Sequence, residues 1–258
     1  MTGQQLWIPA ADTRLNAFDT PGGDPPLLFI NGGFGTTRDW NPVVTQLGGK
    51  YRTVLFDARA RGKSGISADY SMTGAVADVG RVIEQAGLDR PVLVGWSHGA
   101  TTAVRFAAEN PGKAGGLVLI DGGYPITTFD DALKQKVRAQ FRRLGPIMRI
   151  LAALGRSARI APDKAAGLVI EMDEQNGRLG AGFAALQCPA VFVVGTGKHS
   201  GATEDEMTRL RAAAADATAT NPQQVSVFAV VPVNHMQILR QATSTVTAAI
   251  DKVAAARS

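Results

Sequence analysis

Cysteine is nearly absent from this sequence of 258 residues, in which Cys188 is the single one. One cysteine excludes an intrachain disulfide and a zinc site built from several thiolates. No apolar run approaches the roughly 20 residues that a membrane-spanning helix needs. The opening stretch, MTGQQLWIPA, also lacks the basic start and apolar core of a secretory signal. These absences predict a cytoplasmic protein that does not contact a membrane.

Strong charge of one sign is missing too. The formal net charge is only +5, and 45% of the side chains are hydrophobic, so the chain can bury one sizeable core. We expect a small-molecule substrate and no nucleic-acid partner, and the sequence gives no indication of the oligomeric state. Basic residues without acids do gather over 132–162, where a solvated surface and a site for an anionic substrate or partner both stay open.

Short apolar runs alternate with helical patterns along the chain. The runs are almost continuously apolar, which is typical of parallel strands covered on both faces; they lie at 26–31, 52–58, 91–96, 116–121, 190–195 and 224–231. Helical patterns fall at 40–47, 72–87, 98–109, 203–218 and 235–256. We therefore predict an α/β fold: a mostly parallel, doubly wound sheet with helices on both faces and an antiparallel hairpin within 5–19 at its edge.

One stretch interrupts this alternation. More than 60 residues between Asp121 and Ala190 contain no strand pattern. Within them an apolar helical face recurs at Leu133, Val137, Phe141 and Leu144. This indicates an inserted helical cap over 122–187, with residues 1–121 and 188–258 forming the core domain.

A serine flanked by glycines stands where one strand is expected to end. Gly95-Trp96-Ser97-His98-Gly99 follows the apolar run PVLV and precedes a helical pattern. A sharp strand-to-helix turn forces strained backbone angles, and glycine on either side relieves the clash. The pattern is that of a nucleophile elbow, which presents a serine hydroxyl at a helix N-terminus. We predict that Ser97 is a nucleophile.

A serine nucleophile needs a base, and the sequence has three histidines. The side chain of His98 should leave the elbow in another direction. His199, in GTGKHSG, remains possible, but His235, in VPVNHMQIL, follows the last strand and completes the order serine then histidine. We therefore favour His235 as the base.

The base in turn needs a carboxylate that holds its tautomer. After the strand at 190–195 no acid occurs before Glu204 and Asp205, which belong to the next helical pattern. Asp121 ends the strand that follows the nucleophile strand, in LVLIDGGYP. We predict Asp121 as the acid, with a strand-end capping role as the alternative.

The turn NGGFGTTRDW supplies backbone donors for an oxyanion. The N–H of Gly33 or of Phe34 is expected to join that of His98. The turn lacks the Lys-Ser/Thr ending of a nucleotide-binding P-loop, and the sequence predicts neither a metal nor a cofactor. Phe34, Trp96 and Tyr124 are candidates for the substrate pocket, although aromatic residues there also suit a core.

Together these segments resemble the α/β-hydrolase superfamily, in particular its small capped esterases, lactonases and haloperoxidase-like members. NGGFGTTRDW resembles the oxyanion turn, FDARARGKSG the D-x-R-G-x-G-x-S segment, GWSHG the elbow and NHMQIL the histidine turn. Asn31 and Ala60 depart from that pattern, as do Lys198 and His199, which stand where the acid is usual. The resemblance implies a cofactor-independent serine hydrolase acting on an ester, thioester or lactone. A lyase or cyclase using His235 as base and a non-catalytic ligand receptor are the alternatives.

Overall fold

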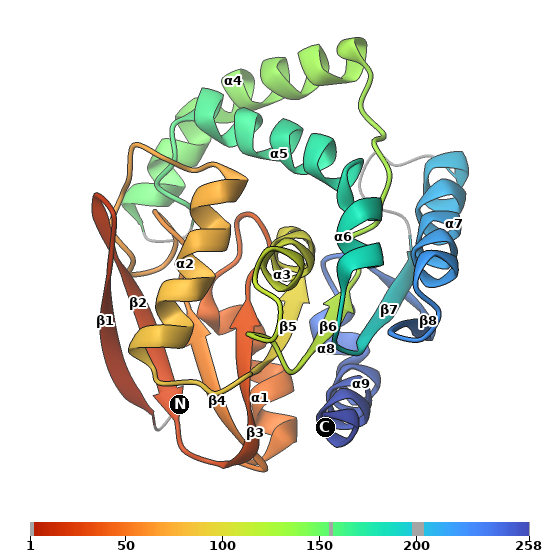
Figure 1. Ribbon diagram of the computed structural model, residues 1–258. Helices are drawn as coiled ribbons and strands as arrows, with labels where there is room; N and C mark the ends of the chain where they lie inside the picture. The colour runs from red at the N-terminus through yellow and green to blue at the C-terminus, as the bar shows by residue number, and fades with distance from the viewer. Residues whose placement is uncertain (1–2, 155–156, 198–203, 258) are drawn as a thin grey trace.

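A computed structural model describes residues 3–154, 157–197 and 204–257. These residues form an eight-stranded sheet in the order β1-β2-β4-β3-β5-β6-β7-β8 (Figure 1). The strands are β1 (Gln4–Ala10), β2 (Thr13–Thr20), β3 (Gly23–Ile30), β4 (Tyr51–Phe56), β5 (Val92–Trp96), β6 (Gly116–Ile120), β7 (Ala190–Gly197) and β8 (Val225–Asn234). β1 and β2 form the antiparallel edge hairpin. The other six strands, β3 to β8, run parallel to one another. The predicted fold class is confirmed.

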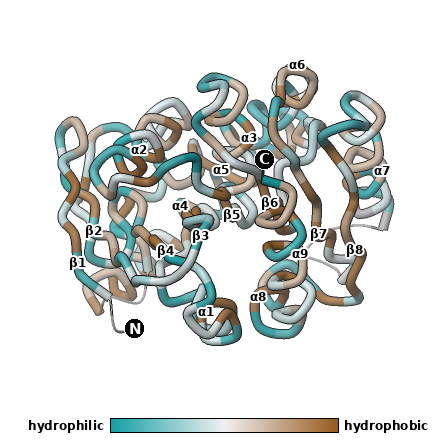
Figure 2. Tube along the Cα trace, turned by 60° about the horizontal axis from the view of Figure 1, so that its bottom comes forward, coloured by the Kyte–Doolittle hydropathy of each residue, from teal (hydrophilic) through white to brown (hydrophobic). Residues whose placement is uncertain are grey.

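Helices cover both faces of the sheet, which explains why its central strands β5 and β6 are apolar at nearly every position. Alternate residues of β3 enter different cores: Leu27 and Phe29 face α1 (Asn41–Leu47) and α9 (Thr243–Ala256), whereas Leu28 and Ile30 face the opposite layer. That layer holds α2 (Met72–Gln85), α3 (His98–Glu109), α6 (Leu179–Ala185) and α7 (Glu204–Thr220). Figure 2 shows hydrophobic colour along the strands between the two layers.

The stretch between β6 and β7 is helical in its described part. α4 (Asp131–Ala153) and α5 (Pro162–Asn176) pack on each other and form the upper part of the molecule in Figure 1. α6 differs, because its apolar residues Leu179 and Phe183 lie in the core beside the sheet. The cap boundaries at 122 and 187 stay a prediction.

The helix expected over 235–256 is wrong at its start. Residues 235–237 form a turn, followed by the short helix α8 (Ile238–Gln241), a break at Ala242 and then α9. At the break, the hydroxyl of Thr243 donates to the carbonyls of Leu239 and Arg240 at 3.0 Å. A side chain that satisfies these carbonyls competes with the backbone ladder and ends α8. His235 consequently lies on a turn before the helix.

None of the helices in the described part of the chain combines the length and hydropathy needed to span a bilayer.

Candidate active site

Ser97 occupies a strained turn between β5 and α3. Its backbone angles are φ 55° and ψ −120°, a conformation that residues other than glycine rarely adopt. A Cβ on Gly95 would lie 2.4 Å from the carbonyl oxygen of Gly99, and one on Gly99 would lie 2.0 Å from that of Ile30. Both neighbours must therefore be glycine for the chain to turn this tightly. The geometry is that expected of a nucleophile elbow.

Asp121 and His235 form an ion-pair-type contact beside the elbow. Asp121 follows β6, and its Oδ2 lies 2.9 Å from Nδ1 of His235. The other carboxylate oxygen, Oδ1, accepts hydrogen bonds from the Tyr124 hydroxyl at 2.8 Å and from the Gly195 N–H at 3.1 Å. The carboxylate is thus held in one orientation, with Oδ2 directed at the imidazole.

Ser97 and His235 line the same cavity, which has a volume of about 520 Å³. Its walls come from the turn after β3, the end of β5 and the helices α4 and α5, which contribute Ala152, Leu168 and Met172. A second cavity, of about 240 Å³, is lined by Ser97, Asp121, Tyr124 and His235. The serine, the histidine and the aspartate predicted from the sequence are therefore brought to one place.

The turn after β3 packs directly against the elbow. The Gly35 N–H donates to the Gly32 carbonyl at 3.0 Å, and a Cβ on Gly32 would lie 3.4 Å from the Cβ of Ser97. Asn31, which departs from the family pattern, donates to the Phe56 carbonyl at 2.8 Å and accepts from the Trp40 indole at 2.5 Å. The Asn31 side chain thus holds the first residue of the turn in place. Neither of its hydrogen bonds involves the backbone N–H of Gly33 or Phe34.

His98 points away from Ser97. It lines a different cavity, of about 30 Å³, that is also lined by Arg61 and Tyr70. Burial, aided by the charge of Arg61, lowers the pKa of His98 from 6.5 to about 3, so the ring is neutral near pH 7. The side chain of His98 therefore leaves the elbow in another direction than that of Ser97, as expected from the sequence.

The three aromatic candidates have different surroundings. Trp96 is buried, lines the 520 Å³ cavity and lies with its ring centroid 5.3 Å from that of His235. Phe34 lines the same cavity, is 39% exposed and contacts Phe141 of α4 with ring centroids 5.7 Å apart. Tyr124 is buried and holds Asp121 through its hydroxyl. Sequence reasoning predicted a pocket role for this tyrosine, which lines the 240 Å³ cavity, but missed its bond to Asp121. The spacing of three residues between the two is the signal that was available.

The structure describes only some of the other candidate acids and bases. Lys198 and His199 fall outside the described residues. Asp205 is exposed on α7, whose first residue is Glu204. Within the described ranges, no three His, Cys, Asp or Glu residues gather closely enough to hold a metal ion.

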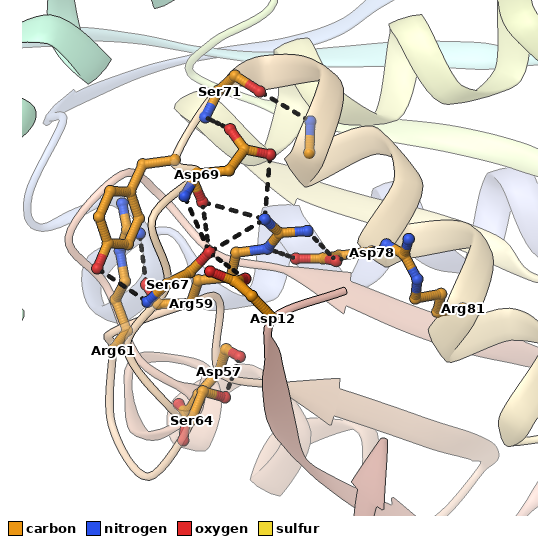
Figure 3. A network of polar contacts seen from close by, with 12 residues as sticks. Asp12, Asp57, Arg59, Arg61, Ser64, Ser67, Asp69, Ser71, Asp78 and Arg81 are labelled. Carbon is orange, nitrogen blue, oxygen red and sulfur yellow. Dashed lines mark hydrogen bonds and ion pairs between the residues drawn. The ribbon is translucent and has the colours of Figure 1, made fainter. Parts of the chain in front are cut away.

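The FDARARGKSG segment contributes several side chains to a network of hydrogen bonds and ion pairs (Figure 3). Arg59 forms a two-pronged contact with Asp78 of α2, at 2.7 and 2.9 Å. Asp57 accepts from the backbone N–H of Thr37 at 2.9 Å and from Nδ2 of Asn16 at 2.9 Å. These bonds tie the segment after β4 to α2, to the edge hairpin and to the residues that follow the oxyanion turn.

Comparison with known proteins agrees with this architecture. The sequence pattern of the family described as alpha/beta hydrolase fold matches residues 25–145. This match, together with the fold shared with solved structures, confirms the resemblance to the α/β-hydrolase superfamily noted in the motifs.

Similar proteins include several hydrolases. A putative carbamate hydrolase, RutD of Escherichia coli O150:H5 (strain SE15), is 27% identical over 118 residues, which cover 45% of this chain and 44% of the relative. The match thus spans less than half of that relative. A thermophilic esterase from Thermogutta terrifontis superposes with a TM-score of 0.75 at 20% identity, covering 99% of this chain and 100% of the other. The enol-lactonase of Burkholderia xenovorans LB400 gives 0.72 at 16%, covering 95% and 98%.

Proposed function

We propose that this chain is a serine hydrolase that cleaves an ester, thioester or lactone of a small organic molecule through an acyl-enzyme on Ser97. The observation that carries the proposal is the 2.9 Å contact between Asp121 and Nδ1 of His235, on the wall of the cavity that contains Ser97. With Nδ1–H donated to the carboxylate, the other ring nitrogen, Nε2, is left unprotonated and able to accept a proton.

The reaction follows from these groups and water alone. Ser97 Oγ attacks the substrate carbonyl while His235 Nε2 takes its proton, and the imidazolium then donates that proton to the leaving alcohol or thiol. His235 next takes a proton from a water molecule, which attacks the acyl carbonyl and releases the acid. The backbone N–H of His98 and one from the turn at residues 32–35 stabilise the tetrahedral oxyanion in both halves.

The bond cleaved is inferred from the site and the similar proteins together. An esterase and an enol-lactonase share the fold across nearly the whole chain, and the relative named a putative carbamate hydrolase matches part of it. All three kinds of bond present a carbonyl carbon with a heteroatom leaving group, which suits an acyl-enzyme. An activated ester is the substrate of choice for a first assay, and a carbamate is the natural second.

A fluorophosphonate probe tests the proposal directly. The probe traps an activated serine as a stable adduct, which intact-mass measurement detects. We expect one adduct on the wild type and none on Ser97→Ala or His235→Ala. Ser226→Ala, which removes a half-buried serine on β8, should keep the adduct. Loss of the adduct in His199→Ala but not in His235→Ala would transfer the role of base to His199.

The two alternatives predict different results. A ligand receptor would give no adduct and no turnover of the activated ester. A lyase or cyclase using His235 as base would convert a suitable intermediate in the Ser97→Ala variant as well, whereas the serine hydrolase loses turnover in that variant. Absence of an adduct on folded wild-type protein would overturn the proposal.

A further inference from the structure

Arg61 is a buried arginine whose side chain holds the oxyanion turn. Only 4% of the residue is exposed. Its Nε donates to the carbonyl oxygen of Gly33 at 2.9 Å, Nη2 donates to the same oxygen, and Nη1 donates to the Arg59 carbonyl at 2.6 Å. The guanidinium also lies 6.0 Å from the ring centroid of Tyr70. Both prongs toward the turn therefore converge on one peptide oxygen.

Arg61 forms no ion pair with the residues that the structure describes. Its neighbour Arg59 is paired with Asp78 and Asp69 (Figure 3), but no carboxylate among the described residues pairs with Arg61. Burial lowers the pKa of Arg61 to about 10, which leaves the guanidinium protonated near pH 7. Burying a cation against carbonyl oxygens is unfavourable unless something compensates it. If residue 61 served only to fill space, an apolar side chain would do so without the free-energy cost of burying a charge.

The peptide that Arg61 grips is the middle one of a β-turn. The Gly35 N–H bonds to the Gly32 carbonyl at 3.0 Å, so the Gly33–Phe34 peptide is the central unit, and its N–H and C=O take no part in the turn's own bond. A trans peptide is planar, with its N–H pointing opposite to its C=O. Reversing both groups would require a positive φ at Phe34, the third residue of the turn, and Phe34 does not have one.

The position of the turn decides where the two groups point. Gly33 lines both the small cavity that contains Arg61 and the 520 Å³ cavity that contains Ser97, so it lies in the wall between them. Its carbonyl is directed to the Arg61 side. The N–H of Phe34 is consequently directed to the Ser97 side.

We propose that Arg61 is a positioning residue that aims the Phe34 N–H at the substrate oxyanion and strengthens it as a donor. This inference rests on the proposed function. A cation bonded to a peptide oxygen polarises the same peptide, which makes its N–H a better donor. The gain is largest when negative charge develops on the substrate oxygen, so it favours the transition state over the bound substrate. It also chooses Phe34 over Gly33 as the donor from this turn.

The test is to change Arg61 and to separate kcat from KM on an activated ester. Removing a whole oxyanion donor lowers kcat by about 10² to 10³-fold, and loss of its positioning should cost a substantial part of this. We therefore expect kcat to fall about 10 to 100-fold in Arg61→Met, which is less than the loss of a whole donor would cost. KM should change by less than about threefold. Affinity for a trifluoromethyl ketone, whose adduct with serine carries the oxyanion, should fall in parallel with kcat/KM.

Two further variants separate positioning from folding. In Arg61→Ala, added guanidinium at non-denaturing concentration should restore part of kcat, whereas the same concentration of sodium chloride should not. Arg52→Met is the matched control, since Arg52 pairs with Asp19 at 2.7 Å and donates to the Ala86 carbonyl at 2.6 Å, away from both cavities. It should lower the melting temperature and leave kcat unchanged.

The outcomes discriminate between the two proposals. A folded Arg61→Met enzyme with wild-type kcat overturns the positioning role, whether or not its KM rises. Either result leaves the proposed serine mechanism intact. If Arg61→Met does not fold, two other variants decide the question. Recovery of kcat in Arg61→Ala on addition of guanidinium, or a reduced kcat in Arg61→Lys, supports the positioning role. The absence of both effects overturns it. A wild type that forms no fluorophosphonate adduct overturns the proposed function itself.

Discussion

Replacing Asp121 with asparagine tests the hydrogen-bond logic of the site with almost no change in shape. Oδ1 of Asp121 receives the backbone N–H of Gly195 at 3.1 Å and the Tyr124 hydroxyl at 2.8 Å. A backbone N–H can only donate, so the amide oxygen of an asparagine must take the place of Oδ1. Its NH₂ group then occupies the place of Oδ2, 2.9 Å from Nδ1 of His235.

This arrangement forces the wrong tautomer on the histidine. Facing a donor, Nδ1 must accept, and the ring proton moves to Nε2, which can then no longer take the serine proton. In other Ser-His-Asp enzymes the equivalent change lowers kcat about 10⁴-fold, which corresponds to about 5 kcal/mol of activation free energy. We expect a loss of this size in kcat for an activated ester, and a similarly slowed reaction with the fluorophosphonate.

Tyr124→Phe is the graded control for this experiment. It removes one donor to Oδ1 but keeps the Gly195 N–H and the contact between Oδ2 and His235. The net value of such a bond is about 1 kcal/mol, so kcat should fall by about fivefold. An Asp121→Asn enzyme that retains more than about a tenth of wild-type kcat would refute the assignment of Asp121 as the acid.

Three more substitutions test the structure around the site. Gly99→Ala places a Cβ 2.0 Å from the carbonyl oxygen of Ile30 and should lower the free energy of unfolding by about 3 kcal/mol or more; wild-type stability in urea titration would contradict the elbow geometry. Arg59→Met leaves the buried carboxylate of Asp78 without its two-pronged partner and should cost about 3–5 kcal/mol, measured in the same way. The low pKa of His98, about 3 against 6.5, means that only the unfolded chain takes up this proton as the pH falls below 6.5. Stability should therefore decrease toward acid by up to about 1.4 kcal/mol per pH unit, and His98→Gln should lack this contribution between about pH 6.5 and 5; identical slopes would refute it.

Most of the fold could be predicted because its determinants are local. Strands buried on both faces must be apolar at nearly every position, and β5 and β6 show this in the sequence as PVLVGW and GLVLID. The elbow could be predicted for a similar reason, since the backbone of Ser97 tolerates only glycine at residues 95 and 99. The position of Asp121 close to Ser97 followed from strand order, because β5 and β6 are neighbours whose carboxyl ends share one edge of the sheet.

The remaining features depend on contacts between distant segments. The bond from Tyr124 to Asp121 requires a particular turn after β6, and the hold of Arg61 on Gly33 joins the loops after β4 and β3. Neither leaves a periodic signal in the sequence. The break at Ala242 escaped prediction because it depends on one hydroxyl, that of Thr243, within a helical pattern that is otherwise continuous.

The contact between Phe34 and Phe141 joins the oxyanion turn to the helix that covers the site. Phe34 belongs to the turn for which we propose an oxyanion donor, and Phe141 belongs to α4, whose residue Ala152 lines the 520 Å³ cavity. Changes to α4 that admit a new substrate will also alter the support of Phe34. In laboratory evolution of this chain, we therefore expect selectivity and turnover to change together, so libraries that vary α4 should include residue 34.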